Sequence, residues 1–304
     1  MMNPRKIIID TDIGDDIDDA FAIALAVCSP ELQLAGVTTV FRNAERRAKM
    51  CRLLLDSYGK GTLPICAGID QPLLQNPPHL SGDRTAPDGS FIPCQFTSEM
   101  EACGCDAMHA VDFLIRTIRK SPGEVTLVPI APLTNIAVAI RMAPDIVGKV
   151  RSICLMGGYF TQNVAEWNIL CDPEAADIVF RSGIPIQAIG LDVTLRCKLE
   201  GRMLEDFRLL RSRSASVLNT MMAGWLESGT QTAPVLHDPL VIASLADPTL
   251  VEFQPRTVKI ARNAEDYGKT QVVPAETPRS AAIDVAVDVD RERFLHFLRN
   301  RLFG

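Results

Sequence analysis

The sequence predicts an α/β fold with an open, mostly parallel, doubly wound sheet that is flanked by helices. Short apolar runs rich in Ile and Val alternate with helical patterns along the whole chain, which is typical of this class. The composition, with 47% hydrophobic and 22% charged residues, provides enough apolar material for a core. No repeat, low-complexity segment or linker divides the 304 residues, so we expect a single domain over 1–304.

Strands are expected at short apolar runs, and helices where apolar residues recur every three or four positions. The strands in chain order are Lys6–Ile9, Leu34–Val40, Leu63–Ala67, Val125–Ile130, Ile153–Met156, Ile186–Ile189, Val251–Ile260 and Ala282–Val287. The helices are Asp18–Val27, Ala44–Tyr58, Ala107–Arg119, Asn135–Met142, Pro173–Arg181, Glu200–Leu210, Ser214–Glu227 and Asp290–Leu302. The segment Gln71–Glu99 is rich in Pro, Gly, Ser and Asp without periodicity, which predicts a long surface loop.

The charge pattern and the start of the chain exclude several classes of protein. The net charge is −6 and no basic block stands out, so we expect no nucleic-acid partner. Three apolar residues after Lys6 are too few for the core of a signal peptide, and no later run is long enough to span a membrane. Nine scattered cysteines fit reduced thiols. We therefore expect a cytoplasmic protein without a membrane partner.

The most informative segment is the acidic run from Asp10 to Asp19, which follows the apolar residues Ile7, Ile8 and Ile9. Its ten residues contain six carboxylates, which equals the excess negative charge of the whole chain. Carboxylates this close repel one another unless a cation or hydrogen-bond donors are present. Ligands of doubly wound sheets bind at the carboxyl ends of strands, so the run predicts a site for a hard divalent cation. The alternative is a solvated acidic turn that caps a helix.

Eight motifs follow one another along the chain and carry a family resemblance. They are Asp12-Ile13-Gly14, Asp18-Asp19-Ala20, Ala131–Ala137, Met156-Gly157-Gly158, Ala165–Asn168, Asp172–Ala176, Leu191–Thr194 and His237-Asp238-Pro239. Together they resemble the nucleoside hydrolase family, the inosine–uridine-preferring type of ribonucleoside N-ribohydrolase. The resemblance implies a nucleoside-hydrolase-like fold and an enzyme that hydrolyses ribonucleosides to ribose and a free base. It also implies a homodimer or homotetramer.

The resemblance implies a Ca²⁺ cofactor that is held by aspartates and one main-chain carbonyl. The matching ligand positions are Asp12, Asp19, Asp238 and, through its backbone oxygen, Ile130. A hard ion of this kind suits the vicinal hydroxyl groups of a ribose and lowers the pKa of a water molecule.

Two residues are candidates for the base that activates the water. This chain has Asp15-Asp16-Ile17 where the family has one residue between the glycine and the aspartate pair. Counting forward from Asp12 selects Asp16, whereas anchoring on the expected start of the helix selects Asp18. We prefer Asp18, because Asp18-Asp19-Ala20 begins the apolar periodicity of the helix.

The same resemblance implies the residues that bind the substrate. Those that match the ribose-binding positions are Asn43, Asn163, Glu166 and Asn168, and His237 matches the position that protonates the departing base in some members. A simpler interpretation remains open for Asn43, which could cap the helix that begins at Ala44 without contacting the sugar. In the long loop, His79 and Asp83 are candidates for contact with the base. Tyr159, Phe160 and Trp225 could each be packing residues or walls that stack on the base.

Carboxylates fit this chemistry, because cleavage of an N-glycosidic bond passes through an oxocarbenium-like sugar whose positive charge they stabilise. Two alternatives stay open at this point. An aspartate-rich loop after a strand is also found in metal-dependent phosphatases, and a non-catalytic nucleoside- or ribose-binding protein could keep the cation site. Activity towards ribonucleosides distinguishes the three.

Overall fold

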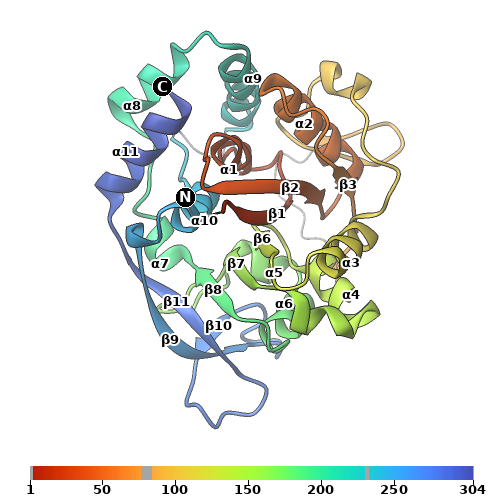
Figure 1. The fold of residues 1–304 in the computed structure, drawn as a ribbon, viewed down its shortest axis with the longest axis vertical. Coiled ribbons are helices and arrows are strands. Elements are labelled where there is room, and N and C mark those ends of the chain that lie inside the picture. The colour runs from red at the N-terminus through yellow and green to blue at the C-terminus, as the bar shows by residue number, and fades with distance from the viewer. Residues whose placement is uncertain (1–2, 77–83, 230–232, 304) are drawn as a thin grey trace.

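A nine-stranded sheet forms the centre of the protein in the computed structural model, which describes residues 3–76, 84–229 and 233–303 (Figure 1). The strand order is β10-β9-β11-β8-β7-β6-β1-β2-β3. The parallel strands are β1 (Arg5–Thr11), β2 (Leu32–Thr39), β3 (Ile65–Ala67), β6 (Thr126–Pro129), β7 (Ser152–Met156), β8 (Ile186–Ile189) and β11 (Ala281–Val289). The strands β9 (Val251–Ile260) and β10 (Thr270–Val272) add an antiparallel edge. The predicted fold class is confirmed.

Helices cover both faces of the sheet. One face carries α1 (Asp18–Val27), α2 (Ala44–Ser57), α8 (Gly201–Arg208), α9 (Arg213–Glu227), α10 (His237–Ala246) and α11 (Arg291–Leu302). The other face carries α3 (Ala110–Lys120), α4 (Thr134–Met142) and α6 (Pro173–Phe180). Side chains of β1 alternate between these faces, so Ile7 and Ile9 join the first core and Ile8 joins the second. A continuous apolar run is what a strand buried on both faces requires.

The strand β1 lies where the strand order reverses. From β1 the chain moves outward to β2 and β3 on one side, and from β6 it later moves to β7 and β8 on the other. The loops after β1 and β6 therefore separate and leave a crevice at the carboxyl ends of the strands. The acidic run Asp10–Asp19 starts in β1 and ends in α1, which places its carboxylates at this crevice.

Most predicted bounds agree with the structure to within three residues, but Gln71–Glu99 is not a continuous loop. It contains a hairpin of β4 (Arg84–Thr85) and β5 (Phe91–Ile92), and the 3-10 helix η1 (Ser98–Ala102) begins before its end. Strands of two residues are too short to produce a periodic pattern. The candidates His79 and Asp83 lie outside the described residues.

Several further elements have no counterpart in the sequence prediction. They are α5 (Trp167–Cys171), α7 (Leu191–Thr194), α10, β10, η2 (Pro144–Lys149) and η3 (Pro248–Leu250). The helix α10 is buried from Asp238 to Leu245, so it lacks the polar face that would reveal a helical period. The remaining elements are too short to establish a period.

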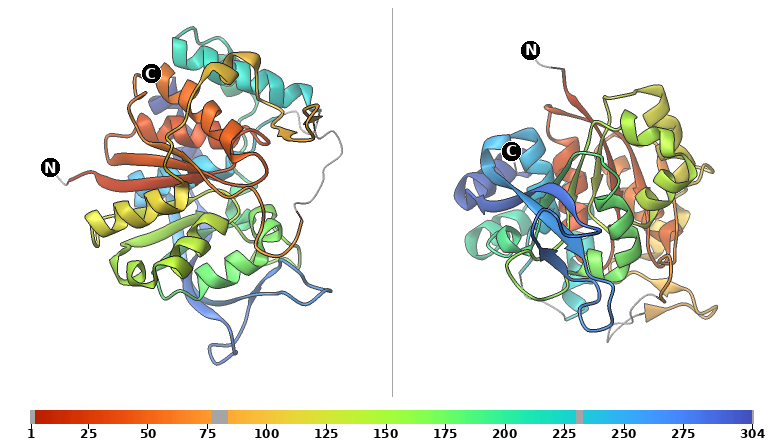
Figure 2. Two further views of the ribbon diagram at one scale, coloured as in Figure 1. Left: turned by 90° about the vertical axis from the view of Figure 1, so that its right-hand side faces the viewer. Right: turned by 90° about the horizontal axis from the view of Figure 1, so that it is seen from below.

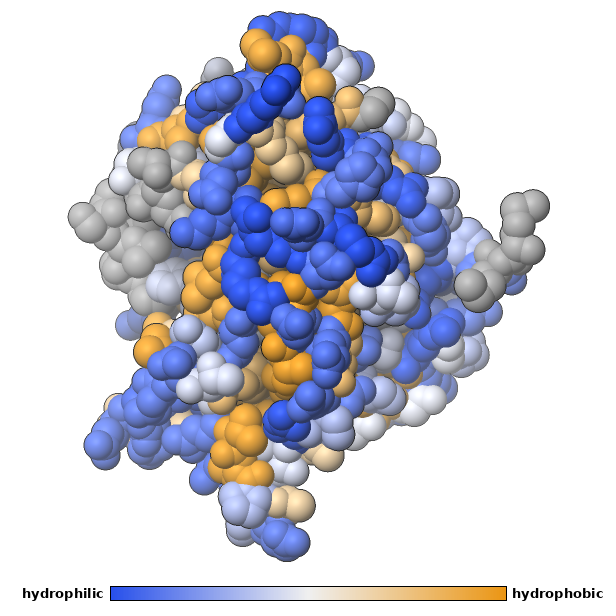
Figure 3. All heavy atoms as spheres, turned by 90° about the vertical axis from the view of Figure 1, so that its left-hand side faces the viewer, coloured by the Kyte–Doolittle hydropathy of each residue, from blue (hydrophilic) through white to orange (hydrophobic). Residues whose placement is uncertain are grey.

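The outer surface is largely polar. On the face that carries α8 and α11, hydrophilic side chains surround smaller apolar patches (Figure 3). Exposed ion pairs there, such as Arg299 with Asp206 at 3.4 Å, contribute about 0–1 kcal/mol each. The β9–β10 edge projects from one end of the molecule (Figure 2). None of the described helices is long and apolar enough to cross a membrane. The nine cysteines are free thiols.

The carboxylate of Asp172 connects three segments beside the crevice. Its side chain is fully buried, and its Oδ1 accepts the N–H of Ala175 at 3.0 Å, which caps α6. Its Oδ2 accepts the hydroxyl of Thr134 at 2.6 Å and the N–H of Leu73 at 3.0 Å. The start of α6 is thereby joined to the start of α4 and to the chain that follows β3.

The substitution Asp172→Ala is expected to lower the free energy of unfolding by about 3 kcal/mol, because it removes a helix cap and leaves two donors without an acceptor. Urea denaturation measures this loss. Asp290→Ala is the matched control, since the exposed Asp290 caps α11 by accepting one N–H, from Arg293 at 3.1 Å. We expect about 1 kcal/mol there. Equal losses in the two variants would mean that Asp172 acts only as a cap.

Candidate active site

A cavity of about 330 Å³ opens at the carboxyl ends of β1, β6 and β7. Loops that follow strands and the first turns of helices supply most of its wall. The lining residues are Asp12, Asp15, Asp16, Asp18, Asp19, Ile130, Met156, Ala165, Glu166, Trp167, Asn168, Leu191, Trp225, His237 and Asp238. Parts of the chain that are far apart in sequence therefore meet in one space, whose size suits a small-molecule ligand.

Three buried aspartates, Asp18, Asp19 and Asp238, converge in this cavity. One carboxylate oxygen from each lies within 4.8 Å of the others. Burial, reinforced by the charge of the neighbouring carboxylates, raises the pKa of each side chain well above its usual range. Hard divalent cations prefer clustered carboxylate oxygens, so this group could bind a metal ion.

Two helix N-termini support the negative charge of this cluster. Asp18 and Asp19 lie in the first turn of α1, and Asp238 lies in the first turn of α10. The two helices pack against each other. Because the N-terminus of a helix carries a partial positive charge, each favours an anion by about 0.3–1 kcal/mol. These terms are smaller than the repulsion between neighbouring carboxylates, so they do not replace a cation.

Two further predicted metal ligands line the same cavity. Asp12 is outside the three-carboxylate cluster, but its charge acts on both Asp19 and Asp238. Burial raises the pKa of Asp12 to about 7, against the opposing effect of the Arg47 guanidinium. Ile130, whose backbone oxygen is the predicted fourth ligand, follows β6 beside them.

Both candidates for the catalytic base line the cavity, but they have different hydrogen-bond partners. Oδ2 of Asp18 accepts the backbone N–H of Asp238 at 3.1 Å, which places Asp18 against α10. Oδ1 of Asp16 accepts the N–H of Ile17 at 2.7 Å, and the side chain also accepts a hydrogen bond from Trp225 of α9. Asp18 is thus part of the carboxylate cluster, whereas Asp16 lies toward α9.

Glu166 and Asn168 are held at the cavity wall by hydrogen bonds. Glu166 is the N-cap of α5, where Oε1 accepts the N–H of Asn168 at 2.8 Å and Oε2 accepts those of Gly158 at 3.0 Å and Ile169 at 3.2 Å. Nδ2 of Asn168 donates to the carbonyl of Met156 at 3.3 Å. Burial raises the pKa of Glu166, and the three amide donors oppose this by favouring its charged form.

His237 opens α10 and also lines the cavity. Its Nδ1 lies 2.7 Å from the hydroxyl of Thr194, which belongs to α7. Burial lowers the pKa of His237 to about 4, so the imidazole is neutral at pH 7. The contact with Thr194 leaves Nε2 as the ring nitrogen available to a ligand.

Two predicted ribose-binding residues do not line the cavity. Asn43 is the N-cap of α2, with Oδ1 accepting the N–H of Arg46 at 3.1 Å and Nδ2 donating to the carbonyl of Phe91 at 3.0 Å. Asn43 therefore caps α2. Asn163 lies on an exposed stretch before α5. A role of either residue in ribose binding stays a prediction.

Some lining residues are absent from the sequence prediction. Met156 precedes Gly157 and Leu191 precedes Asp192, each as the first residue of a family motif. Their place in these motifs could have indicated that they line the site. Trp225, in contrast, is a candidate from the sequence; it is only 1% exposed and yet lines the cavity, so it both packs and forms a wall. No local pattern distinguishes it from other apolar residues of α9.

The chain matches the family model of the inosine-uridine preferring nucleoside hydrolases over residues 7–296. It is 35% identical to the inosine-uridine preferring nucleoside hydrolase of Leishmania major, over 96% of this chain and 95% of that one. It is also 35% identical to the pyrimidine-specific ribonucleoside hydrolase RihA of Photobacterium profundum, over 98% of each chain. The solved structure of a plant nucleoside hydrolase superposes with a TM-score of 0.84 at 30% identity, over 98% of this chain and 99% of that one.

The chain belongs to the nucleoside hydrolase family. It is accordingly a ribonucleoside N-ribohydrolase, a hydrolase that acts on N-glycosyl bonds. Membership sets aside both alternatives that the sequence left open, the phosphatase and the non-catalytic binding protein. The family resemblance that the motifs predicted is confirmed across the chain.

Tryptophan fluorescence is expected to report occupancy of the nucleoside hydrolase cavity, because both tryptophans of the chain line it. Trp167 is half-buried, whereas Trp225 is already buried without a ligand. In Trp225→Phe, saturating D-ribose should reduce acrylamide quenching of Trp167. In the matched control Trp167→Phe, quenching should be low with and without the sugar. Unchanged quenching of Trp167 at saturation would show that the sugar binds elsewhere.

Proposed function

We propose that this nucleoside hydrolase cleaves the N-glycosidic bond of ribonucleosides in a Ca²⁺-dependent reaction in which Asp18 activates the attacking water. The convergence of Asp18, Asp19 and Asp238 within 4.8 Å supports the proposal above all. The residues that would hold the ion are Asp12, Asp19, Asp238 and Ile130 through its backbone oxygen. When bound, the ion supplies positive charge that lowers the pKa of a water molecule and orients vicinal hydroxyl groups.

The arrangement of Asp18 suits a general base. Its Oδ2 is oriented by the N–H of Asp238, and the carboxylate lies within the cluster that would hold the ion and its water. Asp16 is the weaker candidate, because its carboxylate is engaged by the N–H of Ile17 and by Trp225. A base positioned within the carboxylate cluster contributes roughly 10²–10⁴-fold to the rate.

The ribose is expected to lie against Glu166 and Asn168. Glu166 is held by backbone N–H groups and the Asn168 amide by the Met156 carbonyl, so their polar oxygens stay at the wall without reorganisation when the sugar binds. The buried carboxylates also stabilise the positive charge that develops on the sugar ring as the bond to the base breaks.

His237 is proposed to meet the departing base through Nε2. A neutral imidazole whose Nδ1 accepts the hydroxyl hydrogen of Thr194 carries its proton on Nε2 and can donate a hydrogen bond there. This favours departure of the base without a cationic histidine.

We also propose that the protein is cytoplasmic and forms a homodimer or homotetramer. Light scattering on the purified protein measures the number of subunits.

Asp18→Asn is expected to lower kcat by roughly 10²–10⁴-fold, because the amide still accepts the N–H of Asp238 but cannot take up a proton. The matched variant Asp16→Asn should lower kcat by less than about tenfold. Release of free base, followed by ultraviolet absorbance with a panel of purine and pyrimidine ribonucleosides, measures both. A larger loss in Asp16→Asn would identify Asp16 as the base.

Removal of divalent cations with a chelator is expected to abolish base release, and added CaCl₂ should restore it. Calcium should also raise the unfolding temperature, because a ligand at 100 times its Kd stabilises the folded state by about 2.7 kcal/mol. Asp238→Ala should lose this calcium-dependent rise. Full activity in chelator, with no thermal response to calcium, would contradict the proposed cofactor.

A further inference from the structure

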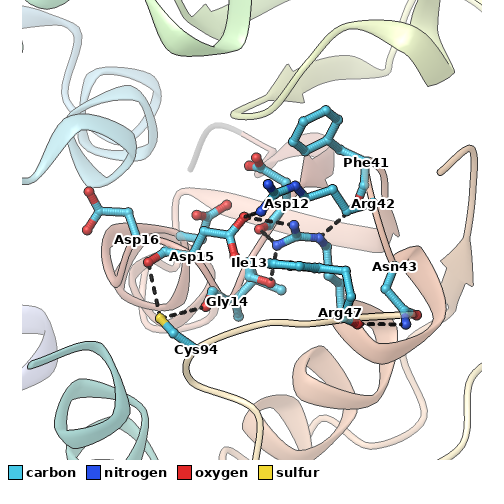
Figure 4. Close-up of polar contacts among 12 residues, drawn as sticks. Asp12, Ile13, Gly14, Asp15, Asp16, Phe41, Arg42, Asn43, Arg47 and Cys94 are labelled. Atoms are coloured by element: carbon cyan, nitrogen blue, oxygen red, sulfur yellow. Dashed lines mark hydrogen bonds and ion pairs between the residues drawn. The ribbon is translucent and has the colours of Figure 1, made fainter. Parts of the chain in front are cut away.

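Arg47 of α2 is a fully buried arginine next to the acidic run (Figure 4). Taking a guanidinium out of water costs several kcal/mol unless charges and hydrogen-bond acceptors offset the loss. The groups that contact Arg47 therefore indicate its role in the structure. Arg47 has no part in the proposed hydrolysis steps.

The guanidinium of Arg47 binds two segments, the acidic run and the chain after β2. Nε donates to the carbonyl of Phe41 at 2.8 Å, and one terminal nitrogen donates to the carbonyl of Ile13 at 2.9 Å and to that of Asp12. The other terminal nitrogen donates to Oδ2 of Asp15 at 2.9 Å. Figure 4 shows the side chain reaching from α2 to these groups. It connects the acidic run with the chain after β2.

The segment after β2 is strained and is held by the same side chain. Phe41 has a φ of 71° and Arg42 a φ of 59°, and two consecutive left-handed residues without glycine cost on the order of 1–3 kcal/mol each. The N–H of Phe41 donates to Ile69 at 2.8 Å, and its carbonyl accepts from Arg47. The turn brings Arg42 within 3.9 Å of Asp15, so this carboxylate lies between two guanidinium groups.

The charge of Arg47 is directed at the carboxylates of the site. Burial disfavours its charged form, but Asp15, Asp12 and Asp19 outweigh this and raise the pKa of Arg47 above its usual value. The guanidinium of Arg47 is therefore always charged. Its positive charge attracts two predicted metal ligands, Asp12 and Asp19, from the side of α2.

We propose that Arg47 is a positioning residue that fixes the backbone of Asp12 and Ile13 through its fork of donors, so that the carboxylate of Asp12 is preorganised for the cation. This inference rests on the proposed function, because it assumes that a cation binds there. Groups that orient metal ligands typically change metal affinity by roughly 10–100-fold when removed. Asp15 serves as the counter-charge that keeps the guanidinium in place.

Isothermal titration of the whole protein with CaCl₂ alone tests the inference. Arg47→Met is expected to bind calcium roughly 10–100-fold more weakly than the unmodified protein. Arg47→Lys keeps the charge but lacks the planar fork, so it should weaken binding at least about threefold. The matched control is Arg52→Met, since Arg52 also belongs to α2 and donates to the carbonyls of Gly61 and Leu63, away from the acidic run. It should bind calcium like the unmodified protein.

Thermal unfolding without calcium separates positioning from stability. Both methionine variants should unfold at lower temperature, but only Arg47→Met should lose calcium affinity in its folded state. If Arg47→Met or Arg47→Lys binds calcium as tightly as the unmodified protein, the positioning role is overturned while the calcium proposal stands. If the unmodified protein binds no calcium, the metal proposal fails first and this inference with it. Should Arg47→Met not fold, the lysine variant decides by the same criterion.

Discussion

The electrostatic repulsion among buried carboxylates at one edge of the sheet is the constraint on which the rest of the site depends. Two unit charges 4–5 Å apart repel by about 4 kcal/mol at an effective dielectric constant of about 20. Asp18, Asp19 and Asp238 lie within such distances of one another, and Asp12 is close by. A single hydrogen bond contributes only about 1 kcal/mol, so hydrogen bonds alone cannot hold this group ionised. For these carboxylates to be ionised together, positive charge must lie nearby.

The fold supplies that charge from several directions. The N-termini of α1 and α10 meet at the cluster, and the buried guanidinium of Arg47 approaches from α2. A divalent cation in the cavity would complete the balance. At the point of strand reversal beside β1, the first turns of α1 and α10 and the ends of neighbouring strands face a common space.

The polar groups around the cluster are held by the same elements that build the fold. Glu166 caps α5, and His237 opens α10 while it contacts Thr194 of α7. Side chains that also act as caps have fixed orientations, which favours chemistry that needs little reorganisation. Loss of such a residue therefore affects stability and function together, and matched controls are needed to separate the two.

Local sequence determined the fold class, the central strands and most of the site. Apolar runs such as Ile7–Ile9 and helical periods such as Ala44–Ser57 have a recognisable pattern because their side chains face a core at regular intervals. The motif series located Asp12, Asp18, Asp19, Glu166, Asn168, His237 and Asp238, all of which line the cavity.

Only the tertiary structure decided which of two aspartates joins the cluster. Asp18 contacts Asp238 and Asp16 contacts Trp225, and both partners lie far along the chain. It also revealed α10, which has no polar face, and Arg47, whose partners at Asp12, Asp15 and Phe41 come from other elements. Periodicity records burial along one element, whereas convergence of charges depends on how elements pack, and no local pattern encodes that.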